Sequence, residues 1–247
     1  MSLLPWNAED LIFDEARFTG AVRLFPLPDL VMFPHVVQPL HIFEPRYREL
    51  LNDALDGDGL IAMSMLAAGW EHDYEGRPAL FPHVCVGKVI THHRLEDGRY
   101  NLMLLGMRRG RIVAEQPATR AFRQAEVVLL DDVYSDQGEA TRNDVQLALA
   151  RQFQKTLPVG KVLAVNEGPV EELLSAEVPL GMLTDLVAFA LPLKPAFKRQ
   201  LLAEVDVDRR AALLLAAMGA PGEVRPTPAS AGIVAARGPY PPRFSCN

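Results

Sequence analysis

The sequence predicts an α+β protein in which a β-barrel-type N-terminal subdomain is followed by an α-helical bundle. Between residues 21 and 132, the chain consists of short segments rich in Val, Ile and Leu, most of them bounded by turn residues. From Thr141 onward, apolar residues recur instead at helical spacing. Several short strands in succession favour a barrel or a sandwich over a parallel α/β sheet. We therefore expect a barrel subdomain over 20–135 and a helical subdomain over 136–219.

Seven segments of the first subdomain have the composition of β-strands. They cover residues 21–27, 36–43, 60–66, 84–95, 99–106, 109–116 and 123–130. The clearest hairpin joins the fourth segment to the fifth, because Asp97-Gly98 supplies the positive φ angles that a tight turn needs. Apolar and polar residues alternate only weakly over 102–106 and 126–130. We expect such a pattern where both faces of a strand are covered.

One helix is predicted to interrupt the strands at residues 44–55. Its apolar residues recur at the spacing of a single helical face. They are Tyr47, Leu50, Leu51, Ala54 and Leu55. Pro45 suits the first helical position, where the missing N–H costs nothing, and Gly57 follows the last turn. We expect Pro34 and Pro39 at edge or bulge positions of the sheet, because proline cannot donate to the ladder of a central strand.

The second subdomain is predicted to consist of helices, most of them opened by proline or aspartate and closed by proline or glycine. The expected helices cover residues 141–157, 169–177, 179–191, 195–205 and 206–219. A leader, 1–19, precedes the barrel, and a tail, 220–247, follows the helices. The tail is rich in Pro, Gly, Ala and Ser and lacks periodicity. We therefore expect it to be disordered.

Composition and charge limit the cellular compartments and the classes of binding partner that suit this protein. The chain has 247 residues and a net charge of -6, which argues against a general nucleic-acid surface. Its two cysteines, Cys85 and Cys246, form no disulfide framework and suit a reducing compartment. The N-terminus has no signal-peptide pattern, and no apolar run reaches eighteen residues. We expect a cytoplasmic protein with no membrane association.

The motifs of common enzyme classes are missing from the sequence. A phosphate-binding loop requires Ser or Thr after Gly-Lys, whereas Val follows both Gly-Lys pairs, 87–88 and 160–161. Neither a G-x-S-x-G elbow nor an H-E-x-x-H helix occurs. We therefore expect a protein that is not an enzyme and that uses no cofactor.

One group of residues was weighed as a metal site. Its members, all potential zinc ligands, are His72, His83, Cys85, His92 and His93. His83 and Cys85 share a strand face, but His92 and His93 must point to opposite faces. The spacings match no zinc-finger pattern. We expect these residues to be surface or half-buried strand residues and expect no bound metal.

A distinctive motif lies in the first fifty residues. It consists of Pro26, Leu27, Pro28, Val31, Phe33, Pro34, Pro39, Leu40, Ile42, Phe43, Glu44, Pro45, Arg46 and Tyr47. This motif resembles the opening of the N-terminal domain of Lon proteases. The similarity continues more loosely through the Asp97-Gly98 hairpin into the helices, so that it covers about residues 20–219. The combination is far more specific than any of its dipeptides.

The resemblance implies a compact barrel of the PUA-like kind followed by a helical bundle. In complete Lon proteases this module recognises and tethers substrate polypeptides and helps assembly, and the ATPase and Ser–Lys peptidase domains lie downstream. This chain stops before either, so the resemblance implies a stand-alone, non-catalytic polypeptide-recognition module. Its implied partners are unfolded or client polypeptides. A separately encoded protease or chaperone and a homodimer remain open as further partners.

Two loop regions are expected to carry the polypeptide contacts, because unfolded clients offer mainly apolar side chains and backbone. The expected contact residues are Met32, Phe33, Trp70, Tyr74 and Phe81. The alternative is that the aromatic rings are structural, with Phe33 and Phe81 plugging the two barrel ends. Ten residues of the motif are also expected to have a structural role: Pro26, Phe33, Pro34, Pro39, Ile42, Phe43, Glu44, Pro45, Arg46 and Tyr47. In particular, we expect Tyr47 to be buried and Arg46 to bond backbone or a nearby carboxylate.

Two other functions compete with polypeptide recognition. PUA-like folds elsewhere bind RNA, and the basic cluster 108–111, with Arg120 and Arg123 nearby, is the feature on which such a function would depend. We expect these arginines to lie on a solvated face at too low a density for RNA binding. A small-ligand pocket in the barrel mouth is the other alternative.

Overall fold

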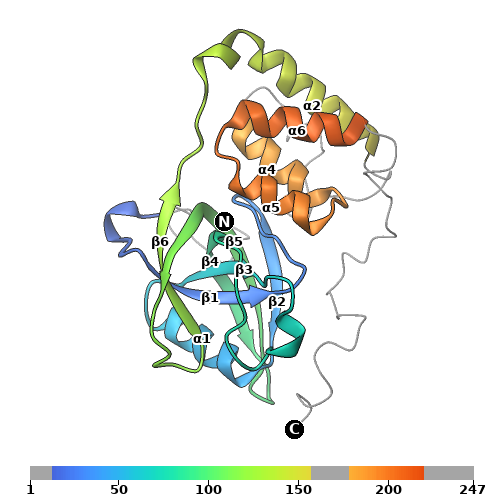
Figure 1. The fold of residues 1–247 in the computed structure, drawn as a ribbon. Coiled ribbons are helices and arrows are strands. Elements are labelled where there is room, and N and C mark those ends of the chain that lie inside the picture. Colours follow the sequence, from blue (N-terminus) through green and yellow to red (C-terminus); the bar gives the residue numbers. More distant parts are fainter. Residues whose placement is uncertain (1–12, 157–177, 220–247) are drawn as a thin grey trace, which may run out of the picture.

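The structure is a computed structural model that describes residues 13–156 and 178–219 (Figure 1). Six strands form the first part: β1 (Ala21–Leu27), β2 (Val37–Ile42), β3 (Leu60–Met65), β4 (His83–Arg94), β5 (Tyr100–Glu115) and β6 (Arg123–Leu130). The α-helices are α1 (Pro45–Leu55), α2 (Arg142–Thr156), α4 (Leu180–Ala190), α5 (Pro195–Ala203) and α6 (Val207–Gly219). Short 3-10 turns lie at Glu15–Arg17, Trp70–His72 and Asp136–Thr141. The predicted helix 169–177 and tail 220–247, and most of the leader, lie outside the described residues.

Five strands close into a barrel. The sheet order is β2-β5-β4-β3-β1-β6, and β6 pairs again with β5, so β5, β4, β3, β1 and β6 form a ring. The β1–β3 pair is parallel, and the other pairs are antiparallel. β2 adds to the first half of β5, from Ile42↔Tyr100 to Val37↔Leu105. β6 pairs with the second half, so one long strand serves two neighbours on the same side.

The prediction of two strands at 99–106 and 109–116 is wrong, because β5 runs without interruption through both. Gly106 suggested a boundary, but its role is to let another segment approach. Its N–H donates to Val36 O, and its carbonyl accepts from His35 N, both at 2.8 Å. A Cβ at this position would overlap the carbonyl oxygen of Phe33. Glycine within a strand commonly marks such close backbone contact.

The local predictions are confirmed for Gly98, Pro45 and Pro39. They are wrong for Asp97, which does not have the expected positive φ, and for Pro34, which lies in a turn before β2 and not at an edge or bulge position. Gly98 has φ +80° in the turn that joins β4 to β5. Pro45 lies in the first turn of α1, whose buried residues are Tyr47, Leu50, Leu51 and Ala54. Pro39 lies in β2, which stands at the end of the sheet order and pairs with β5. An edge strand tolerates proline because one side of it needs no ladder donor.

Both faces of β1 and β3 are covered. Val22 of β1 and Leu60 of β3 belong to a small aliphatic cluster that also includes residues of β4 and β6. Phe25 and Ile61 point the other way, into a larger cluster that includes α1 and extends to the helices. The prediction that both strand faces are covered over 102–106 and 126–130 is wrong, because β5 and β6 alternate between buried and exposed residues there. Met103, for example, is 39% exposed.

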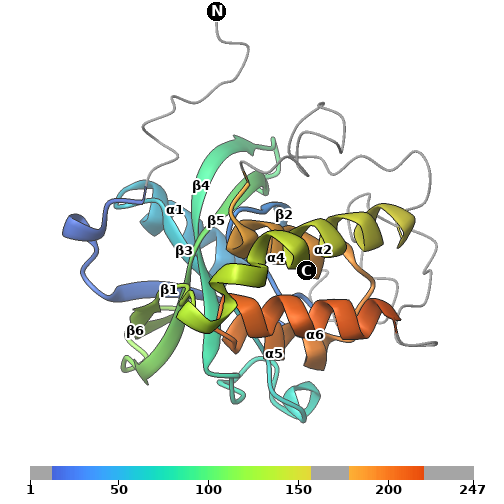
Figure 2. The same ribbon diagram turned by 90° about the horizontal axis from the view of Figure 1, so that it is seen from above.

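The other four helices, α2, α4, α5 and α6, lie together at the end of the barrel opposite to α1 (Figures 1 and 2). α6 packs on α2 and α4, and α5 packs on α4 and against β4. Pro179 precedes α4, and Pro195 stands in the first turn of α5. Within the described ranges, no helix is long and apolar enough to cross a membrane.

A buried ion cluster joins the barrel to the helices. Arg109 of β5 makes two hydrogen bonds to the carboxylate of Asp185 in α4, one of them at 2.8 Å. Arg210 of α6 donates to both oxygens of Asp132, which follows β6, at 2.9 and 2.8 Å. Arg210 also donates to Thr184 at 2.8 Å. Three of the charged side chains, those of Arg109, Asp185 and Arg210, are at most 3% exposed. Such charges are tolerated only when they are paired and hydrogen-bonded.

The ion cluster predicts a loss of stability in acid. Burial alone would raise the pKa of the Asp132 carboxyl, but the hydrogen bonds from Arg210 outweigh it and hold the pKa below its ordinary value. A carboxyl of this kind stabilises the folded state above its unfolded pKa of about 3.9, and the contribution disappears as the pH falls through the folded pKa. We expect the urea midpoint to be flat above about pH 5 and to fall below about pH 4.

The variant Asp132→Asn should show a shallower acid slope than the wild type, because it has no carboxyl to protonate at this position. Asp29→Asn serves as the control, since it removes one exposed carboxyl that lies outside the cluster. Equal acid slopes for the wild type and Asp132→Asn would show that the cluster does not contribute to the pH dependence.

Candidate functional site

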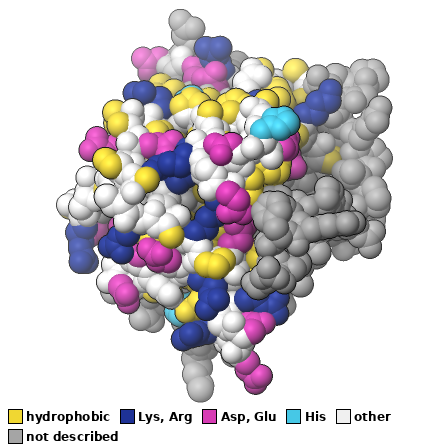
Figure 3. Space-filling model, turned by 60° about the horizontal axis from the view of Figure 1, so that its bottom comes forward, with side chains coloured by type: hydrophobic (Ala, Val, Ile, Leu, Met, Phe, Trp, Pro, Cys, Tyr) yellow, Lys and Arg dark blue, Asp and Glu magenta, His cyan; other side chains and the backbone are white. Residues whose placement is uncertain are grey.

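A hollow with a volume of about 670 Å³ lies beside the start of α1. We call it the motif groove, because residues 43–48 of the sequence motif form one wall. Residues 74–78, between β3 and β4, form the second wall, and residues 118–123, between β5 and β6, form the third. The end of the barrel that carries α1 comes forward in Figure 3, where basic, acidic and hydrophobic side chains are interspersed.

Arg46 fixes the first wall to the second. Its Nε donates to Glu44 Oε2 at 3.0 Å, and its Nη1 donates to the carbonyl oxygen of Tyr74 at 3.2 Å. The Tyr74 hydroxyl donates to the other oxygen of Glu44 at 2.7 Å. The Arg46 guanidinium also lies over the rings of Tyr47 and Tyr74, at 4.8 and 4.5 Å from their centroids. The prediction that Arg46 bonds backbone and a nearby carboxylate is confirmed.

Arg46 keeps its positive charge in this environment. Burial alone would lower the pKa of its guanidinium, but Tyr47, Glu44 and Tyr74 outweigh that effect and raise the pKa above its usual value. A guanidinium held by charge-assisted bonds and two aromatic faces has little freedom to rearrange. Arg46 is therefore a structural part of the groove wall.

Tyr47 anchors the groove to the core. It is 4% exposed, and its ring lies 4.3 Å from the ring of Phe25, centroid to centroid. Its hydroxyl donates to the carbonyl oxygen of Pro26 at 3.4 Å. The prediction that Tyr47 is buried is confirmed, and the groove has its back against the main core cluster.

Two arginines attach the third wall to the second. Arg123 donates to Pro78 O at 2.7 Å and to both oxygens of Glu115, while Arg77 donates to Glu115 and to Gln116 O at 3.2 Å each. Burial alone would raise the pKa of Glu115, but the hydrogen bonds from Arg123 and Arg77 hold it below its ordinary value. One carboxylate thus holds two guanidiniums at this side of the groove.

The predicted contact residues are divided between the core and the surface. Met32 and Phe33 are at most 1% exposed, and Tyr74 is 7% exposed. The expectation that these three side chains are exposed is wrong. Close backbone contact at Gly106 draws the segment 31–36 into the core, and Tyr74 is held in the groove wall by its hydrogen bond to Glu44 and by the Arg46 guanidinium over its ring. Trp70 is half-buried and packs edge-on against Tyr74, with the ring centroids 5.7 Å apart.

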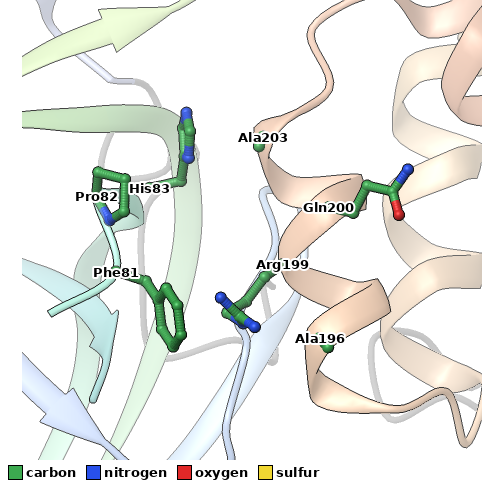
Figure 4. Close-up of a pocket in the computed structure, with 7 residues that line it drawn as sticks. All are labelled: Phe81, Pro82, His83, Ala196, Arg199, Gln200 and Ala203. Atoms are coloured by element: carbon green, nitrogen blue, oxygen red, sulfur yellow. The ribbon is translucent and has the colours of Figure 1, made fainter. Parts of the chain in front are cut away.

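Phe81 is half-buried at a second, smaller hollow of about 250 Å³ between β4 and α5 (Figure 4). The Arg199 guanidinium lies 3.3 Å from the centroid of the Phe81 ring. Lys198, next to Arg199 on α5, donates to Phe189 O at 2.7 Å, and burial lowers its pKa to about 8. Phe81 therefore helps join the barrel to α5, and the structure places it away from the motif groove.

The basic cluster at 108–111 is only partly on the surface. Arg108 pairs with Glu15 and Asp131, and Arg109 is buried in the ion cluster. The expectation that all of these arginines lie on a solvated face is wrong for Arg109, whose partner lies 76 residues further along the chain. The feature on which RNA binding would depend is therefore largely used to hold the fold together.

The residues weighed as zinc ligands do not converge. Cys85 is fully buried, and burial raises the pKa of its thiol well above the ordinary value. His92 and His93 lie near the exposed end of β4. In the ranges that the structure describes, no three His, Cys, Asp or Glu side chains are grouped so that they could hold a metal ion.

Sequence reasoning missed several residues of the groove. Phe122 is buried at its edge, and Arg48 and Arg120 line it from different elements. Arg48 received no predicted role, and Arg120 was considered only as a neighbour of the basic cluster. No local pattern brings α1 and the β5–β6 connection together. The one sequence signal that could have pointed to Arg48 is its position directly after the motif residues Arg46 and Tyr47.

Comparison with known proteins gives a consistent match. Residues 21–219 match the family model described as the ATP-dependent protease La (LON) substrate-binding domain. Lon protease 2 of Desulfotalea psychrophila is 30% identical over 198 residues, and Lon protease of Escherichia coli K12 is 30% identical over 200 residues. Each alignment covers 80% of this chain and 24% of the relative. The chain thus corresponds to about a quarter of the length of these relatives.

Two solved structures show the same fold. The Lon N-terminal domain protein from Xanthomonas campestris is 22% identical, with a TM-score of 0.56 over 79% of this chain and 97% of that one. The N-terminal domain of the Mycobacterium avium complex Lon protease is 20% identical, with a TM-score of 0.61 over 79% and 96%. The closed five-stranded barrel with its helices is therefore the fold of Lon N-terminal domains.

Proposed function

Because this chain belongs to the family of the ATP-dependent protease La (LON) substrate-binding domain, we propose that it binds substrate polypeptides and that the motif groove is its binding site. The observation that carries the proposal is the place of the motif itself. Residues 43–48, which are part of the motif that carries the family resemblance, form one wall of this groove. We further propose that the module is PUA-like, with a helical bundle after it, and non-catalytic.

The shape and chemistry of the groove suit an extended chain. Phe43 and Pro45 offer apolar contacts along it, with the buried Leu66 behind them, while Arg46 and Arg123 hold the walls together. A rigid site loses little conformational entropy on binding. Apolar contacts surrounded by polar groups are the usual anatomy of a recognition surface. The residues therefore provide what an unfolded segment can use, namely apolar pockets and polar rims.

The proposal predicts that Phe43→Ser weakens capture of a permanently unfolded protein, such as a reduced and alkylated one, by roughly tenfold. Phe43 lines the groove and is half-buried, so its removal takes away apolar contact without opening the core. Trp70→Ala, next to the second wall, should weaken capture to a smaller extent. Binding is measured by fluorescence anisotropy, and melting temperature is measured in parallel.

Val128→Ser is the matched control, since Val128 is 49% exposed on β6 and does not line the groove. It should bind like the wild type. Undiminished capture by both Phe43→Ser and Trp70→Ala, at unchanged melting temperature, would place the binding site elsewhere.

A further inference from the structure

We infer that the motif groove selects polypeptide segments in which acidic residues flank an apolar side chain. The inference rests on the proposed function and names the class of segment that the groove prefers. It comes from the charges of the groove, which differ in sign from those of the whole chain. The chain carries a net charge of -6, yet arginine outnumbers glutamate among the residues that line the groove.

The charged residues of the lining share one feature, which is that all the basic ones are arginine. They are Arg46, Arg48, Arg77, Arg120 and Arg123, with the carboxylates Glu44 and Glu75. Arginine presents a planar fork of donors that matches a carboxylate. A segment with carboxylates therefore finds suitable donors in the groove, whereas a basic segment meets repulsion.

Several of these guanidiniums keep capacity for a further carboxylate. Arg77 and Arg123 share the single carboxylate of Glu115. Arg120 is 52% exposed and lies 3.4 Å from Asp53, which is already bonded to Arg23 at 2.5 Å. Each of these carboxylates therefore balances only one of its two arginines, and the groove keeps an excess of positive charge.

Arg48 differs from the other four arginines in its pairing. Its guanidinium extends toward the β4–β5 turn, where a Cβ at Gly98 would overlap it. It makes no ion pair with any residue of the described chain, although it stands in the groove wall on α1. Arg48 therefore offers its donors to a ligand at one end of the groove.

The spacing of the arginines favours side-chain carboxylates over a single terminal one. Arg48 lies on α1, Arg77 between β3 and β4, and Arg120 between β5 and β6. Recognition of a chain terminus needs donors that converge on one point. Donors distributed over three walls, with Phe43 and Leu66 among them, suit acidic residues on either side of an apolar one.

The same groove is poorly suited to a nucleic acid. Glu44 and Glu75 line it, and Glu115 lies directly behind two of its arginines. A phosphate backbone carries dense charge and requires clustered, uncompensated Lys and Arg. The groove carries a moderate positive charge beside apolar surface, which fits a polypeptide with a few carboxylates.

The test uses the full chain and short fluorescent peptides that share a Leu-Phe-Leu centre and have acetylated and amidated ends. Their flanks carry Glu, Gln or Lys. We expect the Glu-flanked peptide to bind roughly threefold to tenfold more tightly than the Gln-flanked one, and the Lys-flanked peptide to bind most weakly. The preference should shrink when the salt is raised from about 0.05 M to about 0.5 M, because exposed charges are screened.

The double variant Arg48→Gln/Arg120→Gln should lose most of the preference for Glu, which is read as the ratio of its affinities for the Glu-flanked and the Gln-flanked peptide. Arg111→Gln/Arg151→Gln is the matched control, since it removes two exposed positive charges outside the groove. It should keep the preference. This combination of results would establish the selectivity and its location.

Equal binding of the Glu- and Gln-flanked peptides would overturn the inference and leave polypeptide binding intact. A Gln-flanked peptide with a free C-terminus that binds as well as the Glu-flanked one would overturn it in favour of terminal carboxylates. Displacement of the Glu-flanked peptide by single-stranded RNA at lower concentration than by unlabelled peptide would overturn it in favour of phosphate. Failure of every peptide and of the unfolded protein to bind would remove the proposed function and the inference together.

Discussion

Asp185→Asn lowers the free energy of unfolding by about 3–5 kcal/mol, the cost of removing one partner from a buried ion pair. The Asp185 carboxylate is fully buried and bonded by Arg109, which is 3% exposed. Without the negative charge, Arg109 and Arg210 remain in the core with Asp132 as their remaining carboxylate in the cluster. Because these residues come from β5, α4, α6 and the segment after β6, the loss should be seen in the global unfolding transition, measured by urea denaturation.

Two comparisons sharpen this expectation. The double variant Arg109→Met/Asp185→Leu should be less destabilised than Asp185→Asn, because apolar side chains of similar volume leave no unpaired charge in the core. Asp97→Asn should leave the urea midpoint close to that of the wild type, since the Asp97–Arg99 pair is exposed. If Asp185→Asn were as mild as Asp97→Asn, the cluster would not be a determinant of stability.

Tyr47→Ala destabilises the protein by a similar amount, about 3–5 kcal/mol, because it removes a large buried ring and leaves a cavity. The ring of Tyr47 packs on the ring of Phe25, and the guanidinium of Arg46 lies over the Tyr47 ring. Its loss therefore weakens both the core and the first wall of the motif groove. Urea denaturation monitored by far-UV circular dichroism measures the change.

Tyr47→Phe separates the ring from its hydroxyl. It should cost only about 0.5–1.5 kcal/mol, since the hydroxyl makes a long hydrogen bond of 3.4 Å to Pro26 O. An unchanged melting temperature of Tyr47→Ala together with lost capture of unfolded protein would reverse the assignment of Tyr47 from structure to binding.

The sequence was sufficient wherever the structural cause is local. The Asp97-Gly98 turn, the first turn of α1 at Pro45 and the edge position of Pro39 each depend on the backbone preferences of one residue and its neighbours. The apolar stripe of α1 likewise reports its buried face directly. These features were predicted correctly because no distant contact competes with them.

The features that were missed depend on contacts between distant segments. The sequence predicts a strand end at Gly106. The structure instead requires glycine there because the backbone of the segment 33–36 lies against it. Arg109 was placed in solvent because its partner Asp185 comes much later in the sequence. The groove was missed for the same reason, since its three walls meet only in the folded barrel.

The closure of the barrel by β6 has a consequence for synthesis of the chain on the ribosome. β6 pairs with both β1 and β5, so the strands β1 to β5 emerge as a sheet with two unpaired edges. Open edges are templates for pairing with other chains, and at about 5–20 residues per second they stay open until β6 has been made. Arg210 must then leave the exit tunnel before the charges of Asp132 are matched. The nascent barrel is thus most exposed to aggregation just before its last strand, and its burial is completed only with its last described helix.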